Sequence, residues 1–82
     1  MNISVLAPER AIFTGEIRAV KVPGVSGEFQ VLNNHAPLVS ALAAGQVTIK
    51  LANNEERSFG IERGFIEVLN NEVSLLVQGV EE

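Results

Sequence analysis

Cysteine, aspartate, tryptophan and tyrosine are all absent from this chain of 82 residues. Without cysteine there can be no disulfide, no thiolate ligand for zinc or an iron–sulfur cluster, and no thiol nucleophile. His35 is the only histidine, and scattered glutamates around it do not provide the several ligands that a metal site needs. We therefore expect no metal site and no cofactor.

The same shortages argue against catalysis. A hydrolase needs a nucleophile, a base and a group that orients the base. Ser40, Ser58 and Ser74 lie inside strand patterns and lack the sequence of a nucleophile elbow. We expect no catalytic residues and no enzymatic activity of the chain on its own. A small hydrolase that uses His35 beside a serine stays open as a minor alternative, which loss of turnover on mutating His35 would support.

Positive charge is also scarce. Six Lys and Arg residues against ten glutamates give a net charge of −4, and the basic residues are scattered. Nucleic-acid binding needs a clustered basic face, and a polybasic membrane anchor needs the same. The Gly24–Gly27 stretch lacks the Lys-Ser/Thr of a phosphate loop. No apolar run approaches the ~20 residues of a membrane span, and no signal-peptide pattern opens the chain. We expect a cytosolic, soluble protein without a nucleotide site.

Short apolar stretches with a period of two residues fill most of the chain. The apolar fraction of 46% is typical of a globular protein, and the length favours one domain over residues 1–82. No stretch has the stripe of an amphipathic helix. The pattern predicts an all-β fold, an antiparallel β-sandwich or flattened barrel of about eight to ten short strands. The predicted strands are residues 2–7, 11–14, 17–22, 29–32, 46–52, 57–62, 65–69 and 72–77.

Glycine, proline and asparagine mark the connections. Gly15 is expected to separate two strands, and the pairs Pro23-Gly24 and Arg63-Gly64 are expected to form turns. Val25-Ser26-Gly27-Glu28 is expected to form a second tight connection after Pro23-Gly24. Three Asn-Asn pairs, which tolerate left-handed φ, predict further reversals at 33–34, 53–54 and 70–71. Residues 38–44 are ambiguous and are read as extended or irregular. Residues 79–82 are read as a tail.

The stretch from Gly24 to Leu42 carries the richest loop chemistry, and binding residues tend to lie on loops held by a rigid scaffold. Four residues of this stretch each allow both a structural and a functional interpretation. His35 is either a surface residue with a local hydrogen bond or a contact in a protein interface. Glu28 is either a solvated turn charge or a charge placed to meet a partner. Phe29 and Leu38 are either core residues or part of an exposed apolar patch.

Two motifs in this stretch resemble a known family. Pro23-Gly24-Val25-Ser26-Gly27-Glu28-Phe29, followed by Asn34-His35-Ala36-Pro37-Leu38, is similar to the N-terminal β-sandwich domain of the epsilon subunit of F-type, proton-translocating ATP synthase. The flanking Phe13-Thr14-Gly15 and Gly64-Phe65-Ile66-Glu67-Val68 agree, and the resemblance covers essentially the whole chain.

The resemblance implies a non-catalytic rotor subunit of the central stalk, at the cytoplasmic face of the bacterial inner membrane and without lipid insertion. Such a subunit joins the gamma subunit to the c ring and couples proton flow to ATP synthesis. By resemblance, Ser26, Gly27, Glu28 and Phe29 face the polar loops of the c ring. His35, Ala36, Pro37 and Leu38 lie close to gamma and the ring.

The chain departs from the family's pattern in two places. Asn33-Asn34 stands where many members carry Pro-Gly, and both pairs suit a tight bend. Many members also continue into a C-terminal helical hairpin, whereas this sequence stops at Glu82. We expect a short form without hairpin-mediated inhibition. The alternative function is an unrelated β-sandwich that binds a ligand or peptide. It predicts a concave groove lined by aromatic residues, which four Phe without Trp or Tyr support poorly.

Overall fold

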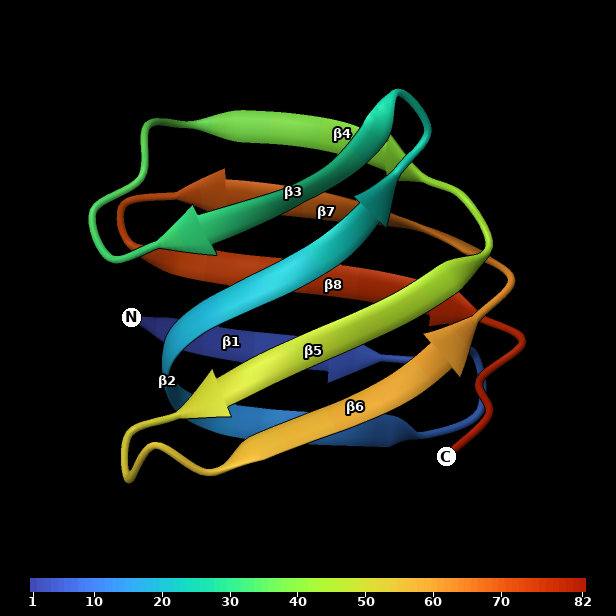
Figure 1. The fold of residues 1–82 in the computed structure, drawn as a ribbon, viewed down its shortest axis with the longest axis horizontal. Coiled ribbons are helices and arrows are strands. Elements are labelled where there is room, and N and C mark those ends of the chain that lie inside the picture. Colours follow the sequence, from blue (N-terminus) through green and yellow to red (C-terminus); the bar gives the residue numbers. More distant parts are fainter.

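The computed structural model describes every residue from Met1 to Glu82 and contains eight β-strands (Figure 1). This number falls within the predicted range. None of its elements is a helix that could cross a membrane. The strands are β1 (Asn2–Leu6), β2 (Ala11–Gly24), β3 (Gly27–Leu32), β4 (Leu38–Leu42), β5 (Gly45–Leu51), β6 (Glu56–Ile61), β7 (Arg63–Leu69) and β8 (Glu72–Gln78).

The strands form two layers joined by the long strand β2. In Figure 1, β3, β2, β5 and β6 cross in front of β4, β7, β8 and β1. The first half of β2 pairs with β1, and its second half pairs with β3 and β5. The order is β1-β8-β7-β4-β2-β5-β6, with β3 on β2 and the additional pair β1–β2. The prediction of a flattened β-sandwich is therefore confirmed.

One pair departs from the antiparallel arrangement, because β1 and β8 run parallel. Neighbouring strands joined by a tight turn must be antiparallel, but nearly the whole chain separates β1 from β8, so no turn fixes their relative direction. The predicted antiparallel arrangement holds for every other pair of strands.

A single cluster of 17 buried apolar residues fills the space between the layers, and no polar or charged side chain is buried there. The alternation read from the sequence holds in the strands that build it. Ile66 and Val68 of β7 are buried on either side of exposed Glu67, and Phe59 and Ile61 of β6 face the same core. The sandwich is thus a stiff unit. Along its strands, every second side chain points into the core and the side chains between them point outward.

Gly15 does not separate two strands. It pairs with Ile3 within the ladder between β1 and β2, so β2 runs without a break from Ala11 to Gly24. The sequence pattern could not reveal this because glycine is typical of turns but is equally compatible with a long strand that bends from one layer to the other.

The predictions of turns at Pro23-Gly24 and Arg63-Gly64 are also wrong, since both pairs lie inside strands. Pro23 lacks an amide hydrogen and cannot donate to a ladder, but its carbonyl still accepts a hydrogen bond of 2.8 Å from the Ala43 amide. The chain reverses at Val25-Ser26, within the predicted tight connection at Val25–Glu28, and bends at Glu62. The predicted tail is partly ordered as well, because Glu81 forms an isolated β-bridge with Gly60.

The three Asn-Asn turns are confirmed. Asn34, Asn54, Asn70 and Asn71 all have positive φ, at 65°, 72°, 52° and 63°. Asparagine tolerates this left-handed conformation better than most residues, because its short side chain can form local hydrogen bonds. The ambiguous stretch 38–44 is extended, as read from the sequence, and forms β4 as far as Leu42.

Candidate partner interface

The first predicted contact segment, Ser26–Phe29, begins in the hairpin turn between β2 and β3. Gly24 and Gly27 pair across a two-residue turn, and Gly27 has a φ of 130°, which glycine adopts without steric cost. The Val25 amide donates a hydrogen bond of 3.2 Å to the Ala41 carbonyl, which fixes the turn against β4. Ser26, Gly27 and Glu28 are exposed.

Phe29 and Glu28 take different roles in this segment. Phe29 is half-buried and packs against the core, so it anchors the hairpin. Glu28 is exposed and forms no ion pair within the chain, since the two ion pairs of the structure join Arg10 to Glu82 and the Met1 amine to Glu16. The Glu28 carboxylate is therefore free to meet a positive or amide group of a partner.

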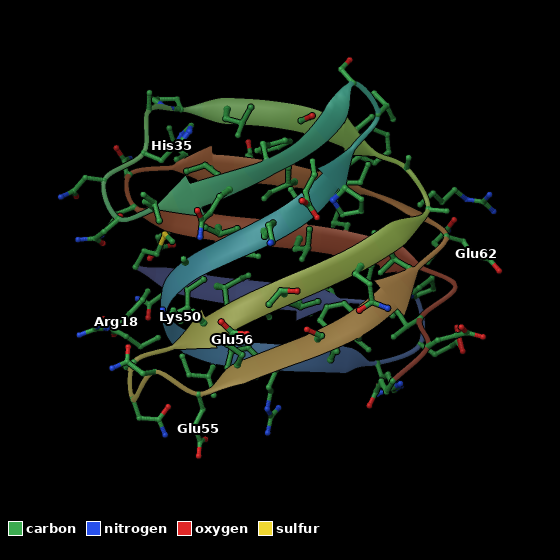
Figure 2. The ribbon with its side chains drawn as sticks, in the orientation of Figure 1. Arg18, His35, Lys50, Glu55, Glu56 and Glu62 are labelled. Atoms are coloured by element: carbon green, nitrogen blue, oxygen red, sulfur yellow. The ribbon has the colours of Figure 1, made fainter.

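The second predicted contact segment, His35–Leu38, connects β3 to β4. The His35 amide donates to the Leu32 carbonyl at 3.1 Å, and His35 Nδ1 lies 2.7 Å from the Ala36 carbonyl oxygen. The first three residues of the segment are exposed, while Leu38 is half-buried and pairs with Val68 as the first residue of β4. Figure 2 shows His35 on this loop, apart from the charged residues Arg18, Lys50, Glu55 and Glu56.

The structure does not bring the two segments into one pocket. They lie at opposite ends of β3, whose six residues span about 20 Å at the usual rise of a strand. Both nevertheless lie at the ends of β3 and β4, which are the outermost strands of the two layers on the same side of the sandwich (Figure 1). We refer to Ser26–Phe29 and His35–Leu38 together as the contact edge. A partner that touched both ends would have to follow the edge along its whole length.

The hydrogen bonds of His35 do not reach a serine. Ser40 Oγ donates to the Ala41 carbonyl at 3.3 Å, and Ser58 Oγ shares a hydrogen bond of 3.1 Å with Thr48 Oγ1. The arrangement of a histidine beside a serine, which the hydrolase alternative requires, is thus not formed by these residues. The structure also brings together no group of three or more His or Glu side chains that could hold a metal ion.

Sequence reasoning missed a second exposed surface, on the outer face of the layer that contains β1, β8, β7 and β4. Leu6 pairs with Leu76, Leu76 with Phe65, and Phe65 with Ala41, so these four residues form a row across the four strands. Leu76 and Phe65 are 52% and 58% exposed. The row borders a groove of about 640 Å³, which Arg63 and Gln78 also line. We refer to this row and groove as the apolar groove.

A signal for the apolar groove was present in the sequence. In a strand with one face in water, apolar and polar residues alternate. Leu75-Leu76-Val77 is instead a continuous apolar run, and apolar Phe65 directly precedes buried Ile66. Such runs indicate that both faces of a strand are covered. The groove reaches Ala41, whose carbonyl accepts the hydrogen bond from Val25, so the groove and one end of the contact edge adjoin through β4.

These features define a class of protein: a small β-sandwich with one polar exposed edge and one exposed apolar groove. Comparison with known protein families identifies the family. The family described as "ATP synthase, Delta/Epsilon chain, beta-sandwich domain" matches residues 1–82. The chain is 41% identical over 79 residues to an ATP synthase epsilon chain of Chlorobium limicola, with 96% of this chain and 90% of that one covered. The chain belongs to the delta/epsilon family of ATP synthase, as the resemblance implied.

A longer relative and two solved structures extend the comparison. An epsilon chain of Helicobacter pylori is 42% identical over 79 residues, which cover 96% of this chain and 63% of that one. The fold superposes with a TM-score of 0.87 on a chain of the Tetrahymena thermophila mitochondrial ATP synthase central stalk and c ring, at 14% identity, covering 100% of this chain and 66% of that one. A chain of the Euglena gracilis mitochondrial ATP synthase gives 0.89 at 21% identity, covering 95% and 50%. At these identities the two structures support the fold alone.

Proposed function

We propose that this chain is a non-catalytic subunit of the central stalk of an F-type ATP synthase, where it links the gamma subunit to the c ring and so couples proton flow to ATP synthesis. The observation that carries the proposal is the identity of 41% with the Chlorobium limicola epsilon chain over 90% of that chain's length. The complex is membrane-bound, and we propose that this subunit lies at its cytoplasmic face in a bacterial cell.

The contact edge is proposed to face the c ring. Its exposed residues are polar or small, apart from Pro37, and it carries the unpaired charge of Glu28. A polar surface suits a contact with polar loops, because both sides keep their polar groups paired with each other or with water. The stiffness of the sandwich favours the transmission of torque, since a mobile surface would absorb rotation.

The apolar groove is proposed to bind the gamma subunit. An exposed apolar patch on a small protein marks an interaction site, and permanent interfaces are more apolar than transient ones. Phe65 lies within the row and is the only aromatic residue that lines the groove. Aromatic residues in the centre of an interface often supply most of its binding energy. Because the groove and the contact edge adjoin at Ala41, the chain can hold gamma and the ring at neighbouring positions.

Copurification with the cognate gamma subunit tests the proposal. Gamma immobilised through a tag is expected to retain this chain, and the complex is expected to bind the isolated c ring. Circular dichroism of the unbound protein serves as the control for folding. A folded chain that gamma does not retain would overturn the proposal and return attention to a β-sandwich that binds another ligand or peptide.

A further inference from the structure

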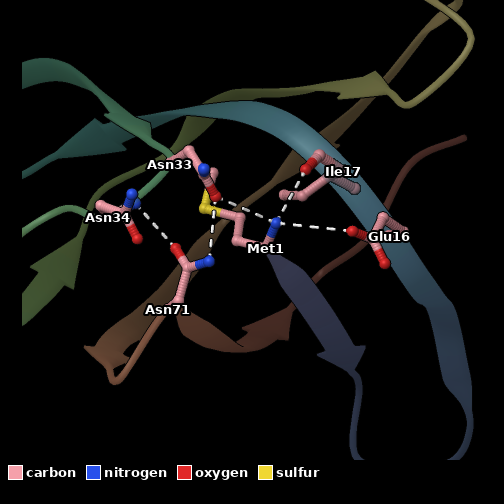
Figure 3. Close-up of polar contacts among 6 residues, drawn as sticks. All are labelled: Met1, Glu16, Ile17, Asn33, Asn34 and Asn71. Atoms are coloured by element: carbon pink, nitrogen blue, oxygen red, sulfur yellow. Dashed lines mark hydrogen bonds and ion pairs between the residues drawn. The ribbon is translucent and has the colours of Figure 1, made fainter.

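Three asparagines and the chain's first residue form a polar cluster at the start of the loop between β3 and β4 (Figure 3). The Asn71 side chain donates from Nδ2 to Asn33 Oδ1 at 2.9 Å and accepts at Oδ1 from the Asn34 amide at 2.7 Å. The Met1 amine donates to the same Asn33 Oδ1 at 3.2 Å. We refer to Met1, Asn33, Asn34 and Asn71 as the asparagine clasp. It joins three segments that lie far apart in the sequence.

Asn71 is held rigidly enough to position its partners. Asn70 and Asn71 form the two-residue turn of the β7–β8 hairpin, between the paired residues Leu69 and Glu72. Positive φ at both turn residues is typical of the tight hairpin turn that matches the twist of its strands. Because the turn fixes the Asn71 backbone and both ends of its amide are bonded, the side chain has little freedom.

The first residue adds a third attachment. Met1 is 7% exposed and belongs to the buried cluster, so its position is fixed by the core. Its amine also donates to the Ile17 carbonyl at 3.4 Å and lies 3.8 Å from Glu16 Oε2. Asn33 Oδ1 therefore accepts hydrogen bonds from two groups, each anchored to a different part of the sandwich.

The loop has few other attachments. Strands β3 and β4 do not pair with each other, so the loop between them is not the turn of a hairpin. Within it the His35 amide bonds to Leu32, and the next fixed point is Leu38, where β4 begins its ladder with β7. His35, Ala36 and Pro37 are exposed between these two points. Without the clasp, the end of the loop near β3 would keep only the local hydrogen bond between His35 and Leu32.

We infer that Asn71 is a positioning residue, which acts through Asn33 and Asn34 to hold His35–Leu38 in the conformation that the partner binds. The inference rests on the proposed function for the identity of that partner, but the positioning itself belongs to the isolated chain. A surface that is ordered before binding loses less conformational entropy in the complex. The affinity for a partner falls in proportion to the fraction of molecules in the competent conformation.

Hydrogen–deuterium exchange of the isolated protein tests the positioning directly. Asn71→Gly removes the side chain and keeps the positive φ, so it separates the loss of the clasp from backbone strain. The amides of Asn34 and His35 are expected to exchange at least about tenfold faster, with the amides of β5 and β6 unchanged. Unchanged exchange at Asn34 and His35 would overturn the inference.

A matched control is available in another Asn-Asn turn. Asn54 has a φ of 72° and accepts a hydrogen bond of 3.0 Å from Arg18, between β5 and β6. Asn54→Gly is expected to leave exchange in the loop between β3 and β4 unchanged. If Asn71→Gly fails to fold, Asn33→Ala replaces it, because Asn33 lacks a positive φ and alanine removes its acceptor.

Binding to the purified complex of gamma and c ring links the clasp to function. Asn71→Gly is expected to weaken affinity by about fivefold to tenfold, while Asn54→Gly binds like the unaltered chain. Wild-type affinity for a variant whose loop exchanges fast would overturn the positioning role. If the unaltered chain itself does not bind, the proposed function fails, and the exchange experiment still decides whether Asn71 orders the loop.

Discussion

Gly64 of β7 lies so close to Leu76 of β8 that a Cβ atom on Gly64 would overlap the backbone carbonyl oxygen of Leu76. Because the obstacle is backbone within a strand ladder, it cannot move aside as a flexible side chain would. Gly64→Ala is therefore expected to lower the free energy of unfolding by about 3 kcal/mol. Denaturation by urea, followed by circular dichroism, measures the change.

Gly60→Ala is the matched control. A Cβ there would meet Gln46 and Glu81 only at 3.6 Å and 3.8 Å, which are ordinary contact distances. Its cost is expected to stay below about 1 kcal/mol. Equal stability of the two variants would mean that the approach of β7 and β8 at Gly64 is looser than described.

Val68→Asp is expected to prevent folding. Val68 is 1% exposed and pairs with Val73 and Leu38 in the middle of the layer, so an aspartate there would be a buried charge without a partner. Val39→Asp places the same residue on β4 at a side chain that is 72% exposed, and it is expected to fold. Circular dichroism and solubility distinguish the two, and a soluble, folded Val68→Asp would show that the core face is misassigned.

The sequence predicted the strands well, because the periodicity of two residues in β7 and β8 reports directly which side chains are buried. It also predicted the Asn-Asn turns, because asparagine tolerates positive φ and this property depends only on the local sequence. It failed at Gly15, Pro23 and Gly64, where the partner strand decides whether a glycine or proline continues the ladder. That decision involves residues on another strand, such as Val77 opposite Gly64.

The candidate interface likewise has a part that the sequence predicted and a part that it did not. Glu28 and His35 could be picked out because they stand in a short loop motif, and the structure places both on the surface. The apolar groove could not be assembled from the sequence, because its row joins Leu6, Ala41, Phe65 and Leu76 from four strands. The asparagine clasp likewise depends on Asn33 and Asn71 meeting across 38 residues.

Glu28→Lys is expected to leave folding intact and to weaken coupling to the c ring. The exposed carboxylate forms no ion pair within the chain, so its replacement should change stability by no more than about 0.5 kcal/mol. Reversal of its charge would place a positive group where the partner meets a negative one. ATP synthesis driven by a proton gradient in reconstituted vesicles measures the coupling.

Glu55→Lys makes the same change of net charge in the turn between β5 and β6, away from the contact edge. It is expected to leave ATP synthesis unchanged. Coupling that is normal with Glu28→Lys would refute the assignment of Ser26–Phe29 to the ring, whatever the control gives.

Phe65→Ala is expected to weaken binding of gamma without unfolding the chain. The ring is 58% exposed, so removing it forfeits little packing in the isolated protein. If gamma covers the apolar groove, removing this ring is expected to cost about 2 kcal/mol of binding free energy, which is roughly 30-fold in affinity. Leu32→Ala shortens an apolar residue that is 53% exposed on the other layer, and it should bind like the unaltered chain. If calorimetry gave both variants the same affinity for gamma, the groove would not be the gamma surface. The contact edge would then have to carry both partners, although none of its exposed residues is a large apolar one.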